Sequence, residues 1–308
     1  MSIMKLQGTF LGWRACALQV VVVALALQVL RSGAQVNMLS DVNSQVFVNH
    51  TTQDGMYNWI VDGQSVAMQK QWFWYRVGSG GREASVDTLP FLGPAFTDRN
   101  PFTDARLDTF AIKYLGPQFT IELTASLQGG AVGSGWADIS EQIKISNSSA
   151  VERLEFHFYQ YADFDLGQAF IPGKAAAIVD DDTVQIKLDQ TTGLPASVMQ
   201  WDGAARVTET IITPDADWGE AGLFNFTIIK LNDGDADNLN NVLGPIGASD
   251  VTWAFQWDFV IDPLASVQIS KDKIVLVPEP GAMVLAGLAL AALIIIRRRQ
   301  QISRKRYI

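Results

Sequence analysis

The stretch Phe119-Thr120-Ile121-Glu122-Leu123-Thr124-Ala125-Ser126-Leu127-Gln128 alternates apolar and polar residues along its whole length. Successive side chains of a β-strand point to opposite faces of a sheet, so this period of two predicts a strand with one buried and one solvated face. The stretch decides the fold because the same pattern returns through most of the chain. No segment between the two chain ends has a convincing helical period.

Further strands are predicted wherever the alternation returns, at 43–49, 66–77, 108–115, 136–146, 151–161, 183–188, 196–201, 205–212, 222–230, 251–261 and 265–277. Turns rich in Gly, Asp and Asn separate these runs, and the Pro- and Gly-rich segment 89–101 is predicted to be a long surface loop. Many short strands without intervening helices are typical of an antiparallel sandwich. We therefore predict one all-β domain over residues 35–277, an antiparallel β-sandwich or jelly roll.

The first 34 residues have the composition of a secretory signal peptide. Lys5 and Arg14 give a positive leader, an apolar run extends from Ala15 to Leu30, and Ser32-Gly33-Ala34 offers small residues for cleavage before Gln35. We predict that residues 1–34 are this signal peptide and that the protein is exported. An uncleaved N-terminal anchor is the alternative.

The body between the two ends is strongly acidic. The whole chain has 23 Lys and Arg against 32 Asp and Glu, and residues 35–277 hold 14 and 31 of these, a net charge of −17. Such a body repels nucleic acid and anionic membrane surfaces, so we expect no nucleic-acid partner. The single cysteine, Cys16, lies in the leader, so the exported body is expected to depend on its core and not on disulfides.

The C-terminal segment 278–308 combines three elements. Pro278-Glu279-Pro280 is followed by an apolar run from Ala282 to Ile296 and then by Arg297-Arg298-Arg299. The apolar run is somewhat shorter than the ~20 residues of a relaxed membrane helix. The basic cluster is expected to stay on the cytoplasmic side. We therefore predict a transmembrane helix that ends in a basic tail.

The order of these elements resembles the PEP-CTERM sorting signal of bacterial exported proteins, over about residues 277–299. The chain departs from the usual pattern by continuing from Gln300 to Ile308. The resemblance implies that an exosortase cuts near Pro278-Glu279-Pro280, while the helix and Arg297-Arg298-Arg299 retain the precursor in the membrane. It also implies delivery to the cell surface or extracellular space of a bacterium that makes exopolysaccharide or biofilm. An ordinary C-terminal anchor is the alternative.

The body itself is also similar to a group of PEP-CTERM precursors. The similar segments are an aromatic strand near the front and three later stretches, at residues 71–76, 159–165, 253–258 and 269–273. This similarity implies a shared architecture and carries no activity with it.

Catalytic patterns are weak, and we expect a protein that is not an enzyme. The histidines His50 and His157 are far apart in sequence. The chain contains no Gly-x-Ser-x-Gly motif that would identify a nucleophilic serine. His157 lies on the polar face of its predicted strand, where a surface histidine is expected. The carboxylate pairs Asp163–Asp165 and Asp215–Asp217 could serve a glycoside hydrolase, but any acidic protein offers such pairs by chance.

One acidic turn could hold a cation. Asp233, Asp235 and Asp237 alternate as the oxygen ligands do in the first half of an EF-hand loop. The match ends at Asn238 and Gly244, where such a loop needs glycine and glutamate. Calcium on the three aspartates is the one cofactor that the sequence suggests, and a solvated polar turn is the alternative.

Aromatic residues offer a second kind of ligand site. Trp218 lies among acidic residues, and exposed Trp rings stack on sugar faces, so this residue is a candidate for binding extracellular polysaccharide. Trp253 and Trp257 share one apolar face and are predicted to lie in the core. The function we expect is a non-enzymatic cell-envelope or extracellular-matrix protein, with exosortase as its processing partner. A calcium-assisted carbohydrate-binding surface module is the alternative, with a glycoside hydrolase less favoured.

Overall fold

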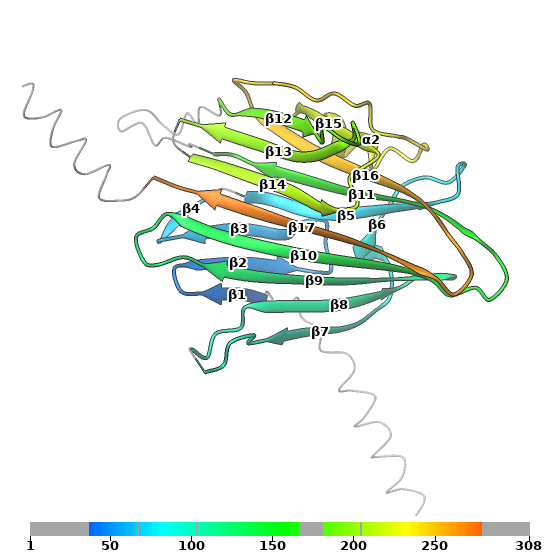
Figure 1. Cartoon of the computed structure of the whole chain (residues 1–308), viewed down its shortest axis with the longest axis horizontal. Coiled ribbons are helices and arrows are strands. Elements are labelled where there is room, and N and C mark those ends of the chain that lie inside the picture. Colours follow the sequence, from blue (N-terminus) through cyan, green and yellow to red (C-terminus); the bar gives the residue numbers. More distant parts are fainter. Residues whose placement is uncertain (1–36, 67, 103, 167–180, 204, 279–308) are drawn as a thin grey trace, which may run out of the picture. The chain divides into compact units, whose positions relative to one another are not determined.

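A computed structural model describes residues 37–278, except for 67, 103, 167–180 and 204. Most of these residues lie in strands of two sheets that pack as a sandwich (Figure 1), which confirms the predicted all-β fold. The predicted signal peptide 1–34 and the apolar run 282–296 lie outside the described residues. Among those that are described, no helix has the length and apolar character that crossing a membrane requires.

The first sheet, sheet A, has nine strands in the order β1-β2-β3-β5-β11-β16-β15, with β4 paired to β3 and β6 paired to β5. Its pairings are antiparallel apart from a short parallel contact between β3 and β5. The strands are β1 (Asn37–Asp41), β2 (Ser44–Asn49), β3 (Gly55–Val61), β4 (Gln64–Ser65), β5 (Met68–Val77), β6 (Ala84–Ser85), β11 (Leu154–Phe164), β15 (Trp218–Leu223) and β16 (Val251–Ile261).

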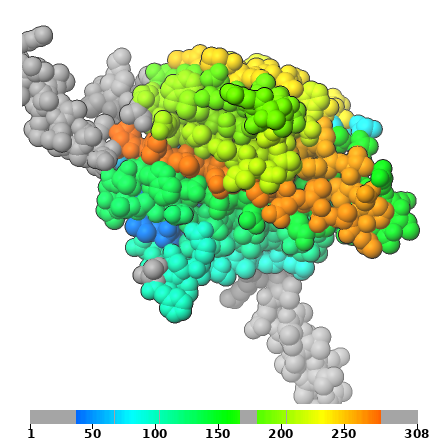
Figure 2. Space-filling view, in the orientation of Figure 1, coloured from blue at the N-terminus to red at the C-terminus, as the bar shows by residue number. Residues whose placement is uncertain are grey.

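The second sheet, sheet B, has eight antiparallel strands in the order β12-β13-β14-β17-β10-β9-β8-β7. These are β7 (Phe91–Thr97), β8 (Thr109–Leu115), β9 (Phe119–Gly129), β10 (Trp136–Asn147), β12 (Thr183–Leu188), β13 (Pro195–Asp202), β14 (Ala205–Thr213) and β17 (Ser266–Leu276). The last strand, β17, is inserted between β14 and β10, and its outer side is the orange band that crosses the molecule in Figure 2. The chain therefore leaves the body from the middle of a sheet.

The core lies between the sheets and follows the period-two pattern. In β9 the apolar positions from Phe119 to Leu127 are buried and the residues between them are partly exposed, as predicted. Trp253 and Trp257 are fully buried, which confirms their place in the core. The Trp253 ring stacks on Phe164, with 5.3 Å between the ring centroids and 7° between the planes. Aromatic burial on this scale stabilises a chain that has no disulfide in its body.

Two predicted elements are wrong. The segment 222–230 is not a strand, because β15 ends at Leu223 and a one-turn helix, α2 (Phe226–Lys230), follows. Asn225 there has a left-handed φ of 73°, which breaks the extended backbone, and the exposed apolar residues of the helix imitate a strand pattern. The segment 89–101 is not all loop, because it contains β7. Pro94 is tolerated in β7 because an edge strand bonds to one neighbour only.

Four charged residues lie buried between the sheets, and we call them the charge cluster: Glu141, Glu209, Lys271 and Lys273. In the strand register Glu141 of β10 stands opposite Lys271 of β17, and Glu209 of β14 stands opposite Lys273. The Lys273 Nζ lies 2.9 Å from a Glu209 oxygen and 3.7 Å from a Glu141 oxygen. The Lys271 Nζ lies 3.4 Å from Glu209 and also contacts Glu141. Each charge therefore faces two of opposite sign.

Two glutamines from sheet A complete the cluster. The Gln71 amide on β5 donates to Glu141 Oε1 at 2.7 Å, and its carbonyl oxygen accepts a hydrogen bond from Lys273. The Gln160 amide on β11 donates to Glu209 Oε2 at 2.8 Å. Both glutamines are fully buried. The cluster thus links the two sheets through hydrogen bonds that satisfy charges which burial would otherwise make costly.

Replacing Asp138 by asparagine is expected to stabilise the body in a pH-dependent manner. Asp138 lies on the outer side of β10, where burial, followed by the charge of Asp272, raises its pKa to about 6. A carboxyl group with a raised pKa in the folded state favours folding while protonated, and that contribution is lost as pH rises from about 4 to about 6. At pH 7.5 we expect Asp138→Asn to add on the order of 1 kcal/mol to the free energy of unfolding.

Urea denaturation of the parent and of Asp138→Asn, at pH 7.5 and at pH 4, measures this effect. The difference between the two midpoints should be much smaller at pH 4, because the carboxyl group is then protonated in the folded state and about half protonated in the unfolded state. A gain of the same size at both pH values would show that the charge of Asp138 is not its cause.

Candidate functional site

The outer face of sheet A carries polar side chains that the sequence pattern alone places in solvent. On β11 these are the alternate residues from Glu155 to Asp163, and on β16 they include Gln256 and Asp258. The expectation of a solvated face for β11 is wrong, because nearly every residue of the strand is buried on both sides. The chain between β15 and β16 crosses this face and covers its middle.

The cover is held by hydrogen bonds from its backbone to buried side chains. The Arg76 guanidinium and the Tyr159 hydroxyl both donate to the carbonyl of Asp237, at 2.8 and 2.9 Å. Arg76 is also paired with buried Glu83 at 2.9 Å. The Leu239 N–H donates to the side-chain oxygen of Gln256 at 2.8 Å. The acidic turn that the sequence singles out is therefore part of this cover.

Next to the covered part lies a group of side chains, which we call the His157 cluster: Glu155, His157, Asp217, Trp218 and Asp258. His157 is buried, Asp217, Trp218 and Asp258 are partly exposed, and Glu155 is exposed. His157 stands opposite Asp258 in the strand register, and its Nδ1 lies 2.6 Å from Asp258 Oδ1. The other ring nitrogen, Nε2, lies 3.4 Å from Glu155 Oε1. His157 is only 8% exposed, so the expectation of a surface histidine is wrong.

Trp218 joins this cluster through its indole. The indole N–H donates to Asp258 Oδ2 at 2.9 Å, while the ring remains partly exposed. The backbone N–H of Asp258 donates to Asp217 Oδ2 at 2.7 Å. The sequence-predicted residues Trp218 and Asp217 are therefore brought together, but their partner is Asp258 and not Asp215. The Asp215 carboxylate accepts a hydrogen bond from the Thr192 hydroxyl at 2.6 Å instead.

The two aspartates of the cluster have opposite pKa shifts. Burial alone would raise the pKa of Asp258, but hydrogen bonds from His157, Gln256 and Trp218 hold it below its ordinary value. Burial raises the pKa of Asp217, and the nearby charge of Asp258 raises it further. The cluster thus combines a well-ionised acceptor, a carboxyl that holds its proton more tightly, and an aromatic ring. Such a set can orient and hydrogen-bond a polar ligand.

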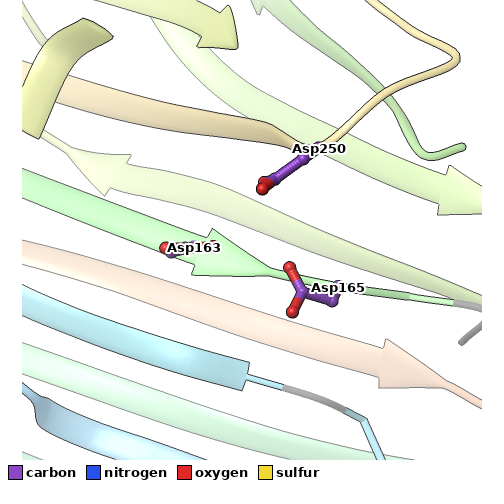
Figure 3. Close-up of side chains that lie close together, drawn as sticks. All are labelled: Asp163, Asp165 and Asp250. Atoms are coloured by element: carbon purple, nitrogen blue, oxygen red, sulfur yellow. The ribbon is translucent and has the colours of Figure 1, made fainter. Parts of the chain in front are cut away.

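At the other end of β11, three carboxylates converge (Figure 3). Asp163, Asp165 and Asp250 each place an oxygen within 4.8 Å of the others, and Asp163 is buried while the other two are partly exposed. The Gln69 amide donates to Asp165 Oδ2 at 2.6 Å. An all-oxygen set of this kind suits a hard cation such as Ca²⁺ or Mg²⁺. Sequence reasoning paired Asp163 with Asp165 but missed Asp250, which lies far away in the chain.

The three aspartates predicted to bind calcium are arranged differently from these converging carboxylates. Asp233 and Asp235 are exposed and Asp237 is partly buried. The Asp235 N–H donates to Asp233 Oδ1 at 2.9 Å, as in a polar turn. Within the described part of the chain, Asp233, Asp235 and Asp237 are not among the carboxylates that converge on one point. Calcium at these three residues remains a prediction.

The described chain ends where the predicted sorting signal begins. The Val277 N–H donates to the carbonyl of Gly135 at 2.8 Å, and the Pro278 carbonyl accepts a hydrogen bond from the Gln64 amide at 3.0 Å. The remaining signal residues, Glu279-Pro280 and Arg297-Arg298-Arg299, lie outside the described residues. The body is therefore held in place up to the first proline of the motif.

Residues 276–299 match the PEP-CTERM protein-sorting motif. The chain therefore carries at its C-terminus the signal of an exosortase substrate. It is a membrane-anchored precursor that is processed and exported to the cell surface or extracellular space. Among curated proteins, none matches the chain.

Two of the solved structures that match this chain each cover about three quarters of it or more. A putative kojibiose phosphorylase from the human microbiome is 9% identical, with a TM-score of 0.39 over 85% of this chain and 32% of that one. This chain thus spans about a third of that protein's length. Galactose 1-epimerase from Lactobacillus acidophilus NCFM is 10% identical, with a TM-score of 0.42 over 76% of this chain and 92% of that one. At such low similarity, the function of this chain does not follow from either protein.

Proposed function

We propose that this chain is a non-enzymatic cell-envelope or extracellular-matrix protein that an exosortase-type membrane enzyme releases from its C-terminal anchor. The observation that carries the proposal is the position of Pro278-Glu279-Pro280 just after the last strand of the described fold, with Pro278 as the last residue that this fold holds. Because β17 ends at Leu276 and the last hydrogen bond among the described residues is accepted at Pro278, a cut near the motif removes no strand that the structure describes. The released body keeps both sheets and its complete core.

Replacing Pro278, Glu279 and Pro280 together by alanine is expected to abolish this release. The variant should accumulate in the membrane fraction, while the parent body is found at the cell surface or in the medium. Immunoblotting of cell fractions with an antibody against the body measures the distribution. The matched control replaces Arg304, Lys305 and Arg306 by alanine, beyond the motif, and should be released like the parent. Equal release of the motif variant would count against exosortase processing.

A second candidate function is carbohydrate binding at the His157 cluster. It is supported by the partly exposed ring of Trp218, whose indole N–H is already bonded to Asp258, so that the ring is fixed as a flat surface. Hydroxyl groups of a sugar stacked on that ring would have carboxylates of the same cluster nearby, that of Glu155 beside His157 and that of Asp217 beside Asp258. Aromatic stacking with polar groups around it is a common mode of sugar recognition.

Removing the ring is expected to weaken this binding roughly five- to tenfold, since one well-placed aromatic contact contributes about 1–1.4 kcal/mol. Binding of Trp218→Ala to polysaccharide fragments on a glycan array measures the effect. Trp201, a partly exposed tryptophan on β13 of sheet B, offers a matched control as Trp201→Ala. Equal losses in both variants, or no glycan bound by the parent, would contradict this function. Loss of binding with a chelator would support its calcium-assisted form.

A further inference from the structure

The charge cluster places an amine, a carboxamide and a carboxyl group in contact at the centre of the sandwich. Lys273 on β17 donates to the Gln71 carbonyl oxygen, so its nitrogen lies next to the amide carbon of a residue in the opposite sheet. Glu141 contacts both partners, because Oε1 accepts from the Gln71 amide at 2.7 Å and Oε2 lies 3.7 Å from the Lys273 Nζ. These three groups are the reactants and the proton carrier of an amide exchange.

We propose that Lys273 and Gln71 join in an intramolecular isopeptide bond that covalently links sheet B to sheet A, with Glu141 as the residue that carries the proton. Nothing in this proposal depends on the sorting signal or on carbohydrate binding. It concerns a modification of the folded body and needs no cofactor or second protein.

The reaction balances within the cluster. Lys273 first gives a proton to Glu141, and its free amine then attacks Cδ of Gln71, forming the Nζ–Cδ bond. As the Cδ–Nε2 bond breaks, Glu141 passes a proton to Nε2, which leaves as ammonia, and takes up the proton that the new amide nitrogen loses. The products are a secondary amide, neutral ammonia and a protonated Glu141. No oxidant, reductant or water is required.

The surroundings favour this outcome. Burial lowers the pKa of Lys273, although the neighbouring glutamates oppose the shift, so the free amine is easier to form than in water. Exclusion of water protects the new amide from hydrolysis. The reaction also converts four buried charges into one pair, Lys271 with Glu209 at 3.4 Å, and the cluster remains electrically neutral. Fewer buried charges mean a smaller desolvation cost.

The position of the bond suits an exported chain whose body has no cysteine. β5 and β17 are widely separated in sequence, and β17 is the strand from which the chain leaves the body. A covalent link there would hold the last strand to the opposite sheet while the chain end is held in the membrane. It would take the place that disulfides occupy in many secreted proteins.

Peptide mapping of the purified full chain tests the proposal directly. Trypsin cuts after Lys70 and Arg76 and releases a peptide that begins at Gln71. In the linked protein this peptide should be joined to the segment that holds Lys273, with a mass one ammonia below the sum of the two. The joined pair is the readout, because a peptide with N-terminal glutamine can lose ammonia by cyclising alone. Gln160, buried on the next strand, is an internal control and should remain unlinked.

Two variants separate chemistry from folding. Glu141→Gln keeps the shape and the hydrogen-bonding capacity of the side chain but not its ability to carry a proton, so the joined peptide should form roughly 100-fold more slowly. Gln71→Leu has no acyl group and should give no joined peptide. Near-ultraviolet circular dichroism reports whether each variant is folded. A folded parent chain that yields only the free Gln71 peptide would overturn the proposal, as would undiminished linkage in Glu141→Gln.

Discussion

Replacing Glu209 by alanine is expected to lower the free energy of unfolding by about 3–5 kcal/mol, since it removes one partner from a buried ionic network. The carboxylate is fully buried and accepts from Lys273 at 2.9 Å and from Gln160 at 2.8 Å. The variant leaves the buried lysines of the charge cluster with one carboxylate fewer to balance their charge. Urea unfolding followed by tryptophan fluorescence measures the loss.

The shifted pKa of the Glu209 carboxyl predicts how the stability of the protein depends on pH. Burial alone would raise the pKa of Glu209, but the charges of Lys271 and Lys273 hold it below its ordinary value. A carboxyl group with a lowered pKa in the folded state stabilises the protein above the pKa of the unfolded chain, about 4.3. That contribution is lost as pH falls through the lower pKa of the folded state. The cost of Glu209→Ala should therefore shrink in strong acid.

An exposed ion pair of similar geometry is the control. Lys113 and Glu122 stand opposite each other on β8 and β9 with 3.1 Å between charged atoms, and both side chains are 40% exposed. Glu122→Ala should change the free energy of unfolding by less than about 1 kcal/mol. If Glu209→Ala costs no more than Glu122→Ala, the buried network is not a stabilising part of the fold.

Replacing Trp257 by alanine is expected to cost about 3–5 kcal/mol, the range for large aromatic residues in a packed core. The ring is fully buried, with its centroid 6.2 Å from that of Phe158 and 6.1 Å from that of Phe255. Its indole N–H donates to the carbonyl of Pro214 at 3.0 Å, so the substitution also leaves that acceptor without its partner. Thermal and urea unfolding measure the effect.

The control for Trp257 is an aromatic residue that buries little. Phe226 on α2 is 66% exposed, and Phe226→Ala should stay within about 0.5 kcal/mol of the parent. Similar losses in the two variants would mean that Trp257 is not part of a well-packed core. A selective loss of ligand binding in Trp257→Ala, with unchanged stability, would assign this residue to a site instead.

Periodicity predicts this fold well because one face of most strands packs against the opposite sheet. It fails where an apolar or polar pattern does not come from a strand with one buried and one solvated face. Phe226 and Ile229 continue an apolar run, but Asn225 turns the chain before them and places them on a short helix. The polar face of β11 is misread for a related reason. Its alternation is correct, yet the segment between β15 and β16 covers the polar side as well, and local sequence does not record such long-range cover.

The candidate site is predicted only in part, because its pairs depend on register between distant strands. Trp218 and Asp217 stand out from their neighbours in sequence, whereas Asp258 becomes the partner of His157 only once β11 and β16 are aligned. The lysines of the charge cluster are easier to recognise from the sequence than the His157 cluster. Ile269 and Val275 mark the inner face of the last strand, and the same period places Lys271 and Lys273 on that face. Two lysines on a buried face require buried acidic partners.

The central claim is that the body is delivered outside the cell without its C-terminal anchor, and the fate of the two chain ends tests it most directly. One epitope is placed just after Gln35 and another after Ile308, and cell fractions are compared by size. We predict that the front epitope appears outside the cell on a species shortened by the sorting signal and lacking the rear epitope. Both epitopes on one full-length species in the membrane would contradict the claim and define a tethered domain.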